Sequence, residues 1–190
     1  MIIIYLILKK VINMIKIKKF NEINVIPNSL IVFDIDDTLI KFDGIDQKWW
    51  INKINKHFKI TQNDDFADYL AHKDWCDLVS KINPEIVDEE IHEFIEFVKQ
   101  KNCEIILLTA RNSIMKDITK KHLETVNLYF DENNIYFNGN KGEELFKIVH
   151  EKYNYISNII MIDDIENNLE DIKEKMLNTK FNVYLYNIKF

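Results

Sequence analysis

The chain has 190 residues, of which 47% are hydrophobic and 29% charged, a composition typical of one globular domain or of one domain with a small insertion. Residues 1–20 contain five lysines and no acid, so the remainder carries 20 basic against 31 acidic residues, a net charge of −11. This acidity argues against a nucleic-acid partner, since phosphates need a basic face. The two cysteines and the five scattered histidines lack metal-ligand spacing, which disfavours a disulfide scaffold or a structural zinc site.

The N-terminal segment, residues 1–25, begins with apolar and basic residues (MIIIYLILKKVINMIKIKKF). Its first apolar run is far shorter than the roughly 20 residues that span a bilayer, and it lacks a small-residue cleavage site. Two interpretations are favoured: a first strand or helix packed on the domain, or an upstream extension with Met14 as the true start. Contact of residues 1–20 with an anionic membrane surface is the less favoured alternative.

Apolar runs along the chain predict the strands of a parallel sheet. Continuous apolar runs are typical of strands that are buried on both faces of such a sheet. The runs that meet this description most clearly are LIVFDI at 30–35, CEIILLTA at 103–110 and NIIMIDD at 158–164, with NVYLYNI at 182–188 as a fourth and IYF at 135–137 as a short addition.

Helical patterns lie between the predicted strands, at residues 83–102, 113–126, 141–153 and 167–177. In the first of them, Pro84 and the acids that follow it suit a helix start. Alternation of strands and helices predicts an α/β fold with a doubly wound parallel sheet and helices on both faces. Residues 42–82 also have a helical pattern, but they are too long for a simple crossover, and we interpret them as an insertion above the end of the sheet.

Polar side chains end each of the three long apolar runs. The first run ends in Asp34, Asp36, Asp37 and Thr38, the second in Thr109 and Arg111, and the third in Asp163 and Asp164. Ligands of open parallel sheets bind outside the carboxyl ends of the strands, so we expect these side chains to converge. Clustered carboxylates need a cation, a proton or open solvent. Lys141, at the start of a predicted helix, is flanked by two of the three glycines.

This arrangement resembles the haloacid dehalogenase (HAD) superfamily, specifically its magnesium-dependent phosphatases. The matching segments are FDIDDTL at 33–39, similar to an Asp-x-Asp-x-Thr motif after an apolar strand, LLTAR at 107–111, Lys141, and MIDD at 161–164. GIDQKWW at 44–50 gives a looser resemblance to uncharacterised bacterial HAD-like proteins. The resemblance implies a Rossmann-like core from residues 26–41 and 83–190, with residues 42–82 as a small helical cap.

The resemblance also implies roles for individual residues. Asp34 would be the nucleophile that forms an aspartyl-phosphate, and Asp36 would protonate the leaving oxygen and then deprotonate water. Because side chains two apart in an extended segment point to one side, both can face one substrate. The implied cofactor is Mg²⁺, held by Asp34, the backbone carbonyl of Asp36, and Asp163.

The remaining motif residues are expected to bind the substrate or to support the residues that hold the metal. Thr109 would donate to a phosphoryl oxygen, Lys141 would offset negative charge, and Arg111, the only arginine of the chain, would contact substrate. Supporting groups are Thr38, Asp37, Asp164 and Asn167. Asn167 stands where many relatives carry an acid.

Several alternatives remain open on the residues alone. Lys147 is the rival of Lys141, and Asp164 is an alternative metal ligand. Pairing of Arg111 with an acid near the strand end is as favoured as substrate contact. Trp49 and Trp50 are interpreted as packing residues more readily than as a platform for substrate.

The expected activity is Mg²⁺-dependent hydrolysis of a phosphomonoester, on a phosphorylated metabolite, a nucleotide or a phosphoprotein, in the cytoplasm. The main alternative is a receiver-type phosphoacceptor or a non-catalytic binding module. A receiver, however, carries its phosphoacceptor on a later strand, which the Asp-x-Asp-x-Thr pattern fits poorly. A phosphotransferase or a dehalogenase is a third possibility, of which Asp36 disfavours the dehalogenase.

Overall fold

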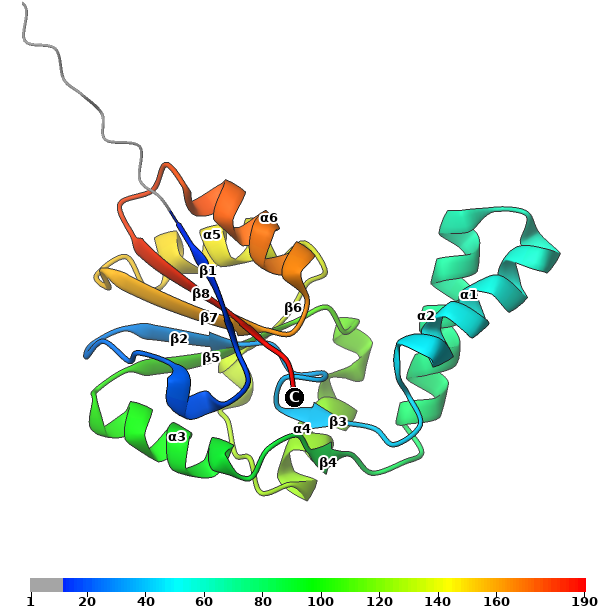
Figure 1. Cartoon of the computed structure of the whole chain (residues 1–190), viewed down its shortest axis with the longest axis horizontal. Coiled ribbons are helices and arrows are strands. Elements are labelled where there is room, and N and C mark those ends of the chain that lie inside the picture. Colours follow the sequence, from blue (N-terminus) through cyan, green and yellow to red (C-terminus); the bar gives the residue numbers. More distant parts are fainter. Residues whose placement is uncertain (1–11) are drawn as a thin grey trace, which may run out of the picture.

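The computed structural model describes residues 12–190, and a six-stranded parallel sheet forms its centre (Figure 1). All neighbouring strands of this sheet are parallel. In spatial order the strands are β1 (Met14–Ile17), β8 (Asn182–Ile188), β7 (Asn158–Asp163), β2 (Leu30–Phe33), β5 (Glu104–Thr109) and β6 (Ile135–Phe137). The five strands predicted from apolar runs are therefore confirmed.

The edge strand β1 answers part of the question about the N-terminal segment. Residues 14–17 pair with β8, in the register Met14 to Leu185, and Ile12 is buried in the core. This part of the segment is packed on the domain, as one interpretation expected. Residues 1–11, which contain the whole first apolar run and part of the segment 1–20 considered for membrane contact, lie outside the described residues. Within residues 12–190, no helix is both long and apolar enough to cross a membrane.

Helices cover both faces of the sheet, as predicted for a doubly wound fold. The helices α3 (Glu90–Gln100) and α4 (Lys116–Thr125) lie on one face, and α5 (Lys141–Glu151) and α6 (Glu166–Met176) on the other (Figure 1). Because strand side chains alternate, Ile31 of β2 belongs to the core on the α3 side and Val32 to the core on the α5 and α6 side. Three short 3₁₀ helices complete the core, at Phe20–Glu22, Ser113–Met115 and Glu132–Asn134.

The predicted helix start at Pro84 is wrong. Residues just after Pro84 form the short strand β4 (Glu85–Ile86), antiparallel to β3 (Ile40–Lys41), and α3 begins only at Glu90. The backbone N–H of Val87 also donates to the carbonyl of Leu39 at 3.1 Å. These hydrogen bonds keep residues 85–87 extended. The acidic residues that suit a helix start therefore lie at the beginning of α3, several residues after Pro84.

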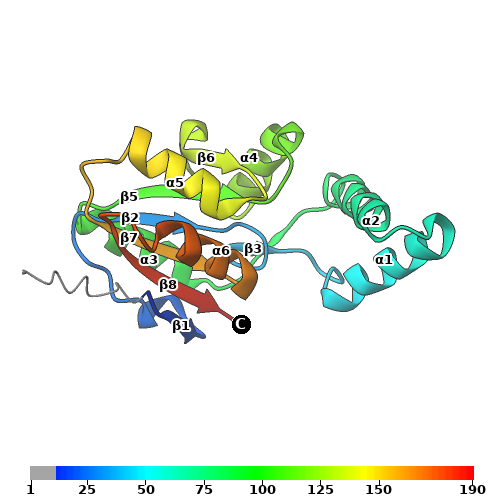
Figure 2. The same ribbon diagram turned by 90° about the horizontal axis from the view of Figure 1, so that it is seen from above.

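Two helices, α1 (Gln47–Thr61) and α2 (Asp64–Val79), occupy most of residues 42–82 and form a hairpin. Asp46 caps α1 by accepting from the N–H of Trp49 at 2.8 Å, and Asn63 caps α2 by accepting from that of Phe66 at 2.9 Å. The hairpin stands apart from the core, beyond the ends toward which the strand arrows point (Figure 2). The β3–β4 pair holds its two ends together at the base.

Candidate active site

The loop after β2 presents acidic side chains at the carboxyl end of the sheet. Asp34 follows the last residue of β2, and its N–H donates to the carbonyl of Ile162 on β7 at 2.9 Å. Asp37 takes a left-handed backbone conformation with φ of 55°. The N–H groups of Leu39 and Ile40 both donate to the carbonyl of Ile35, which closes the loop tightly. The chain therefore turns back within a few residues and keeps its carboxylates at this edge.

Lys141 joins the carboxylates that follow the first and end the third apolar strand. Its Nζ donates to Asp34 Oδ1 at 2.5 Å and to Asp163 Oδ2 at 2.7 Å, and all three side chains are buried. Burial alone would lower the pKa of Lys141, but the charges of the two aspartates outweigh it, and the net pKa is raised. Burial likewise raises the pKa of Asp34 well above its ordinary value, against the opposing charge of Lys141. The rival Lys147 lies exposed on α5, away from this cluster.

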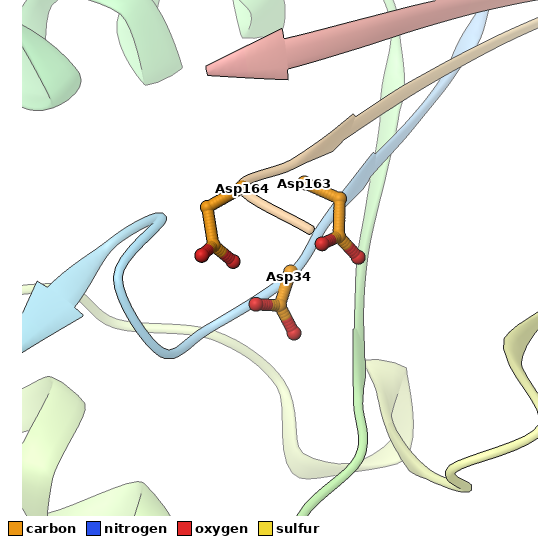
Figure 3. A group of neighbouring side chains, drawn as sticks. All are labelled: Asp34, Asp163 and Asp164. Atoms are coloured by element: carbon orange, nitrogen blue, oxygen red, sulfur yellow. The ribbon is translucent and has the colours of Figure 1, made fainter. Parts of the chain in front are cut away.

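Three carboxylates gather where a cation could bind. Asp34, Asp163 and Asp164 each offer an oxygen, and these oxygens lie within 4.8 Å of one another (Figure 3). Among residues 12–190, no donor reaches the buried Oδ1 of Asp164. Burial, with a contribution from the charge of Asp163, raises the pKa of Asp164 to about 7. The backbone N–H of Asp164 donates to Thr38 Oγ1 at 3.2 Å, so the buried threonine fixes this residue.

Asn168, rather than the predicted Asn167, supports Asp163. Its Nδ2 donates to both carboxylate oxygens of Asp163, at 3.2 and 3.1 Å, and the N–H of Ile165 donates to the Oδ1 at 2.7 Å. Asn167 is exposed. The chain turns directly from β7 into α6, and the first turn of the helix directs position 168, not 167, toward the strand end. Asp164, which was expected to support the ligands, instead offers a possible cation ligand of its own.

Arg111 pairs with Asp36 through two parallel hydrogen bonds. Nε donates to Oδ2 at 2.8 Å and Nη2 to Oδ1 at 2.7 Å, while the arginine side chain is only 1% exposed. Its Nη1 donates to Thr119 Oγ1 at 3.0 Å and contacts His122 Nδ1 at 3.2 Å. Since arginine has only donors, Nδ1 of His122 must accept, which matches a pKa lowered to about 4 by burial and by the Arg111 charge. Pairing with a strand-end acid, one of the two interpretations of Arg111, is what the structure shows.

Thr109 ends β5 beside this pair. It is fully buried, and its Oγ1 accepts a hydrogen bond from the N–H of Arg111 at 3.1 Å. The hydroxyl proton can still donate to a bound group.

A cleft of about 230 Å³ connects these residues with the hairpin. The predicted residues that line it are Asp34, Asp36, Asp37, Thr109, Arg111, Lys141 and Asp164. Asn167 instead lines a neighbouring open depression. The side chains of residues 42–75 that line the cleft are Phe42, Ile45, Trp50, His72 and Trp75. Of these, the sequence analysis considered only Trp50, and it favoured a packing role; the dense aromatic content of residues 42–75 was the available signal.

Several solved structures have a fold similar to that of this chain. A putative β-phosphoglucomutase from Thermotoga maritima aligns with a TM-score of 0.52 and 15% identity, over 83% of this chain and 84% of that one. The class C acid phosphatase from Bacillus anthracis aligns with a TM-score of 0.48 and 15% identity, over 84% and 66% of the two chains. The HAD domain of effector protein Lem4 from Legionella pneumophila aligns with a TM-score of 0.47 and 15% identity, over 85% and 86%. At such identities, the first of these likenesses is evidence about the fold alone.

Comparisons of the sequence itself give one family. No curated protein matches the chain. The model of a family described as "Protein of unknown function (DUF2608)" matches residues 8–139, which is more than half of the chain. The protein therefore belongs to the DUF2608 family, and its core has the HAD-like α/β fold.

Proposed function

We propose that the protein hydrolyses phosphate monoesters through an aspartyl-phosphate on Asp34, with Mg²⁺ as cofactor. One observation carries this proposal: Asp34 lies in a cleft at the carboxyl ends of the strands, bonded to Lys141 and close to two further carboxylates. A carboxylate that attacks a phosphate must overcome the repulsion of like charges, which requires cations beside it. The site supplies one as Lys141, and its carboxylates suit a second.

The donor set fits a hard divalent cation. Mg²⁺ prefers oxygen ligands, and Asp34, Asp163 and Asp164 offer carboxylate oxygens within 4.8 Å of one another. The partnerless Oδ1 of Asp164 is a buried acceptor that a cation would satisfy. The backbone carbonyl of Asp36 is a further ligand in this proposal. When bound there, the ion would neutralise charge on the phosphoryl group and on Asp34.

The chain's own residues account for the two half-reactions. A carboxylate oxygen of Asp34 forms a bond to phosphorus while the bond from phosphorus to the ester oxygen breaks, and Asp36 gives a proton to the departing oxygen. A water then attacks the aspartyl-phosphate and loses a proton to Asp36, and the bond between phosphorus and Asp34 breaks. The products are the alcohol and inorganic phosphate.

Three neighbours assist this chemistry in the proposal. Lys141 and the hydroxyl of Thr109 stabilise the transferring phosphoryl oxygens. Arg111 fixes the rotamer of Asp36 through its two hydrogen bonds, while each oxygen of Asp36 keeps a lone pair that can carry the proton given to the departing oxygen and later taken from water. The role of Arg111 is thus to position Asp36 rather than to touch substrate.

The test is hydrolysis of p-nitrophenyl phosphate with and without Mg²⁺, by the wild type and by Asp34→Asn. The substitution keeps the shape of the side chain but removes the nucleophile and one cation ligand, so activity should fall by at least about a thousandfold. Asp117→Asn makes the same change on an exposed residue of α4 and should leave activity unchanged. Undiminished turnover by Asp34→Asn would refute the nucleophile assignment. A stoichiometric burst of p-nitrophenol without turnover would instead favour a phosphoacceptor module.

A further inference from the structure

The wall of the cleft that faces the catalytic edge is built from stacked rings. Trp50 of α1 lies 6.0 Å from Trp75 of α2, with ring planes at 30°. His72 lies 5.8 Å from Trp50 and 5.6 Å from Trp75, with planes at 33° and 30°. Trp75 is nearly buried, whereas Trp50 and His72 are half-buried and line the cleft. A flat apolar group that enters the cleft therefore meets aromatic side chains.

This ring wall is anchored to the core through Trp75. The guanidinium carbon of Arg111 lies 5.4 Å from the ring of Trp75 and 5.8 Å from that of Phe42. Both rings belong to the core cluster, and they meet edge to face at 6.5 Å. Since the arginine that holds Asp36 also holds Trp75, the rings have a fixed relation to the catalytic edge. A preformed surface of this kind costs little ordering on binding.

Among the described residues, both cationic side chains that line the cleft are already paired with carboxylates. Its lining contains two cations within the described part of the chain, Arg111 and Lys141. Arg111 is committed to Asp36, and Lys141 is committed to Asp34 and Asp163. The same lining contains four carboxylates, Asp34, Asp36, Asp37 and Asp164. With the proposed Mg²⁺ and a phosphoryl dianion both bound, the charges in the cleft still sum to about −2, so a carboxylate or a second phosphate on the leaving group would meet net negative charge.

We propose that this cleft selects phosphate monoesters whose leaving group is a neutral, flat aromatic ring, stacked on Trp50 and His72. The inference rests on the proposed function and names its substrate class. The volume of about 230 Å³ is below the usual range for drug-sized ligands, roughly 300–1,000 Å³, and so fits one ring system. Apolar burial and ring stacking favour such a group over a chain of hydroxyls, which would find few hydrogen-bond partners on the ring wall.

The test compares benzyl phosphate with 2-methoxyethyl phosphate. Their leaving alcohols have similar acidity, so a difference in kcat/KM reports on the cleft and not on the chemistry of bond cleavage. We expect benzyl phosphate to be preferred by about tenfold or more in the wild type. 4-Carboxybenzyl phosphate, which adds one anion to the same ring, should lose most of that preference.

Two variants locate the preference. Trp50→Ala should reduce the preference for benzyl phosphate to within about threefold while 2-methoxyethyl phosphate is still hydrolysed, which shows that the site is intact. Tyr69→Ala is the control, because Tyr69 is an exposed aromatic residue of α2 that does not line the cleft. It should keep the preference. Equal kcat/KM for both esters in the wild type, or an undiminished preference in Trp50→Ala, would overturn the inference and leave the proposed function standing.

Failure of the proposed function has a different result. If neither ester is hydrolysed with Mg²⁺, the proposed phosphatase function is refuted, and so is the inferred preference for aromatic esters. An aromatic ring can come from a small molecule or from a phosphotyrosine side chain. Comparison of phenyl phosphate with N-acetylphosphotyrosine amide separates these sources, since only the second requires room for peptide groups beyond the ring.

Discussion

Arg111→Met tests whether the buried guanidinium stabilises the fold as the structure indicates. Methionine fills much of the apolar volume of the arginine stem but removes every donor. The change leaves Asp36 without its bidentate partner, and it leaves the buried acceptors Thr119 Oγ1 and His122 Nδ1 without the arginine N–H groups. It also removes the cation between Phe42 and Trp75.

The expected cost follows from how exposed each partner is. The Asp36 side chain is 30% exposed and can regain water, so we assign about 1–2 kcal/mol to the lost ion pair, below the 3–5 kcal/mol of a fully buried one. The two stranded acceptors cost about 1 kcal/mol each. The cation–ring contacts add about 1 kcal/mol. The free energy of unfolding should fall by roughly 4–5 kcal/mol, which corresponds to a Tm roughly 8–20 °C lower in a chain of this size.

Urea denaturation of the wild type and of Arg111→Met measures this loss. Lys120→Met removes a cation from an exposed position of α4 and should change the free energy of unfolding by less than about 0.5 kcal/mol. A double-mutant cycle with Asp36→Asn should give a coupling energy of about 1–2 kcal/mol. A loss below 1 kcal/mol in Arg111→Met, or a coupling energy near zero, would refute the reasoning.

Three further predictions concern pH, packing and metal. Burial and the charge of Arg111 lower the pKa of His122 to about 4, so between about pH 6.5 and pH 4 the unfolded chain binds a proton that the native state excludes. The free energy of unfolding should therefore fall by up to about 3 kcal/mol over this range. A His122→Asn variant whose urea midpoint shows the same fall would contradict this prediction. Gly142→Ala should lower the free energy of unfolding by about 1–3 kcal/mol, since an added Cβ would lie 2.7 Å from the carbonyl oxygen of Asp171, and an unchanged thermal melt would show that the helices can separate at no cost. Mg²⁺ should raise the Tm of the wild type by binding the native state, and Asp163→Asn should remove most of that rise; a wild-type Tm that is insensitive to Mg²⁺ would argue against the cation site.

The sequence by itself determined the sheet and the edge at which the candidate site lies. Apolar runs such as residues 30–33 and 158–163 are local signals, because a strand that is buried on both faces needs continuous apolar side chains. Once parallel strands are assumed, their carboxyl ends meet at one edge. Asp34, Thr109 and Asp163 could therefore be placed together before any contact was known.

Tertiary structure alone decided which partners these groups take. The pairing of Asp36 with Arg111 joins residues 75 positions apart, and it depends on how β2 and β5 lie side by side. The choice of Asn168 over Asn167 depends on the angle at which α6 leaves β7. Neither quantity is encoded in a local pattern of apolar and polar residues.

The hairpin of α1 and α2 shows the same division most clearly. Its helical patterns and capping residues, Asp46 and Asn63, are local and readable in the sequence. That Trp50 and His72 line a cleft with Asp34 follows from the β3–β4 pairing, which brings the two ends of the hairpin together over the sheet edge. A side chain's neighbours are set by the path of the whole chain, so the aromatic lining of the cleft could be found only in the folded protein.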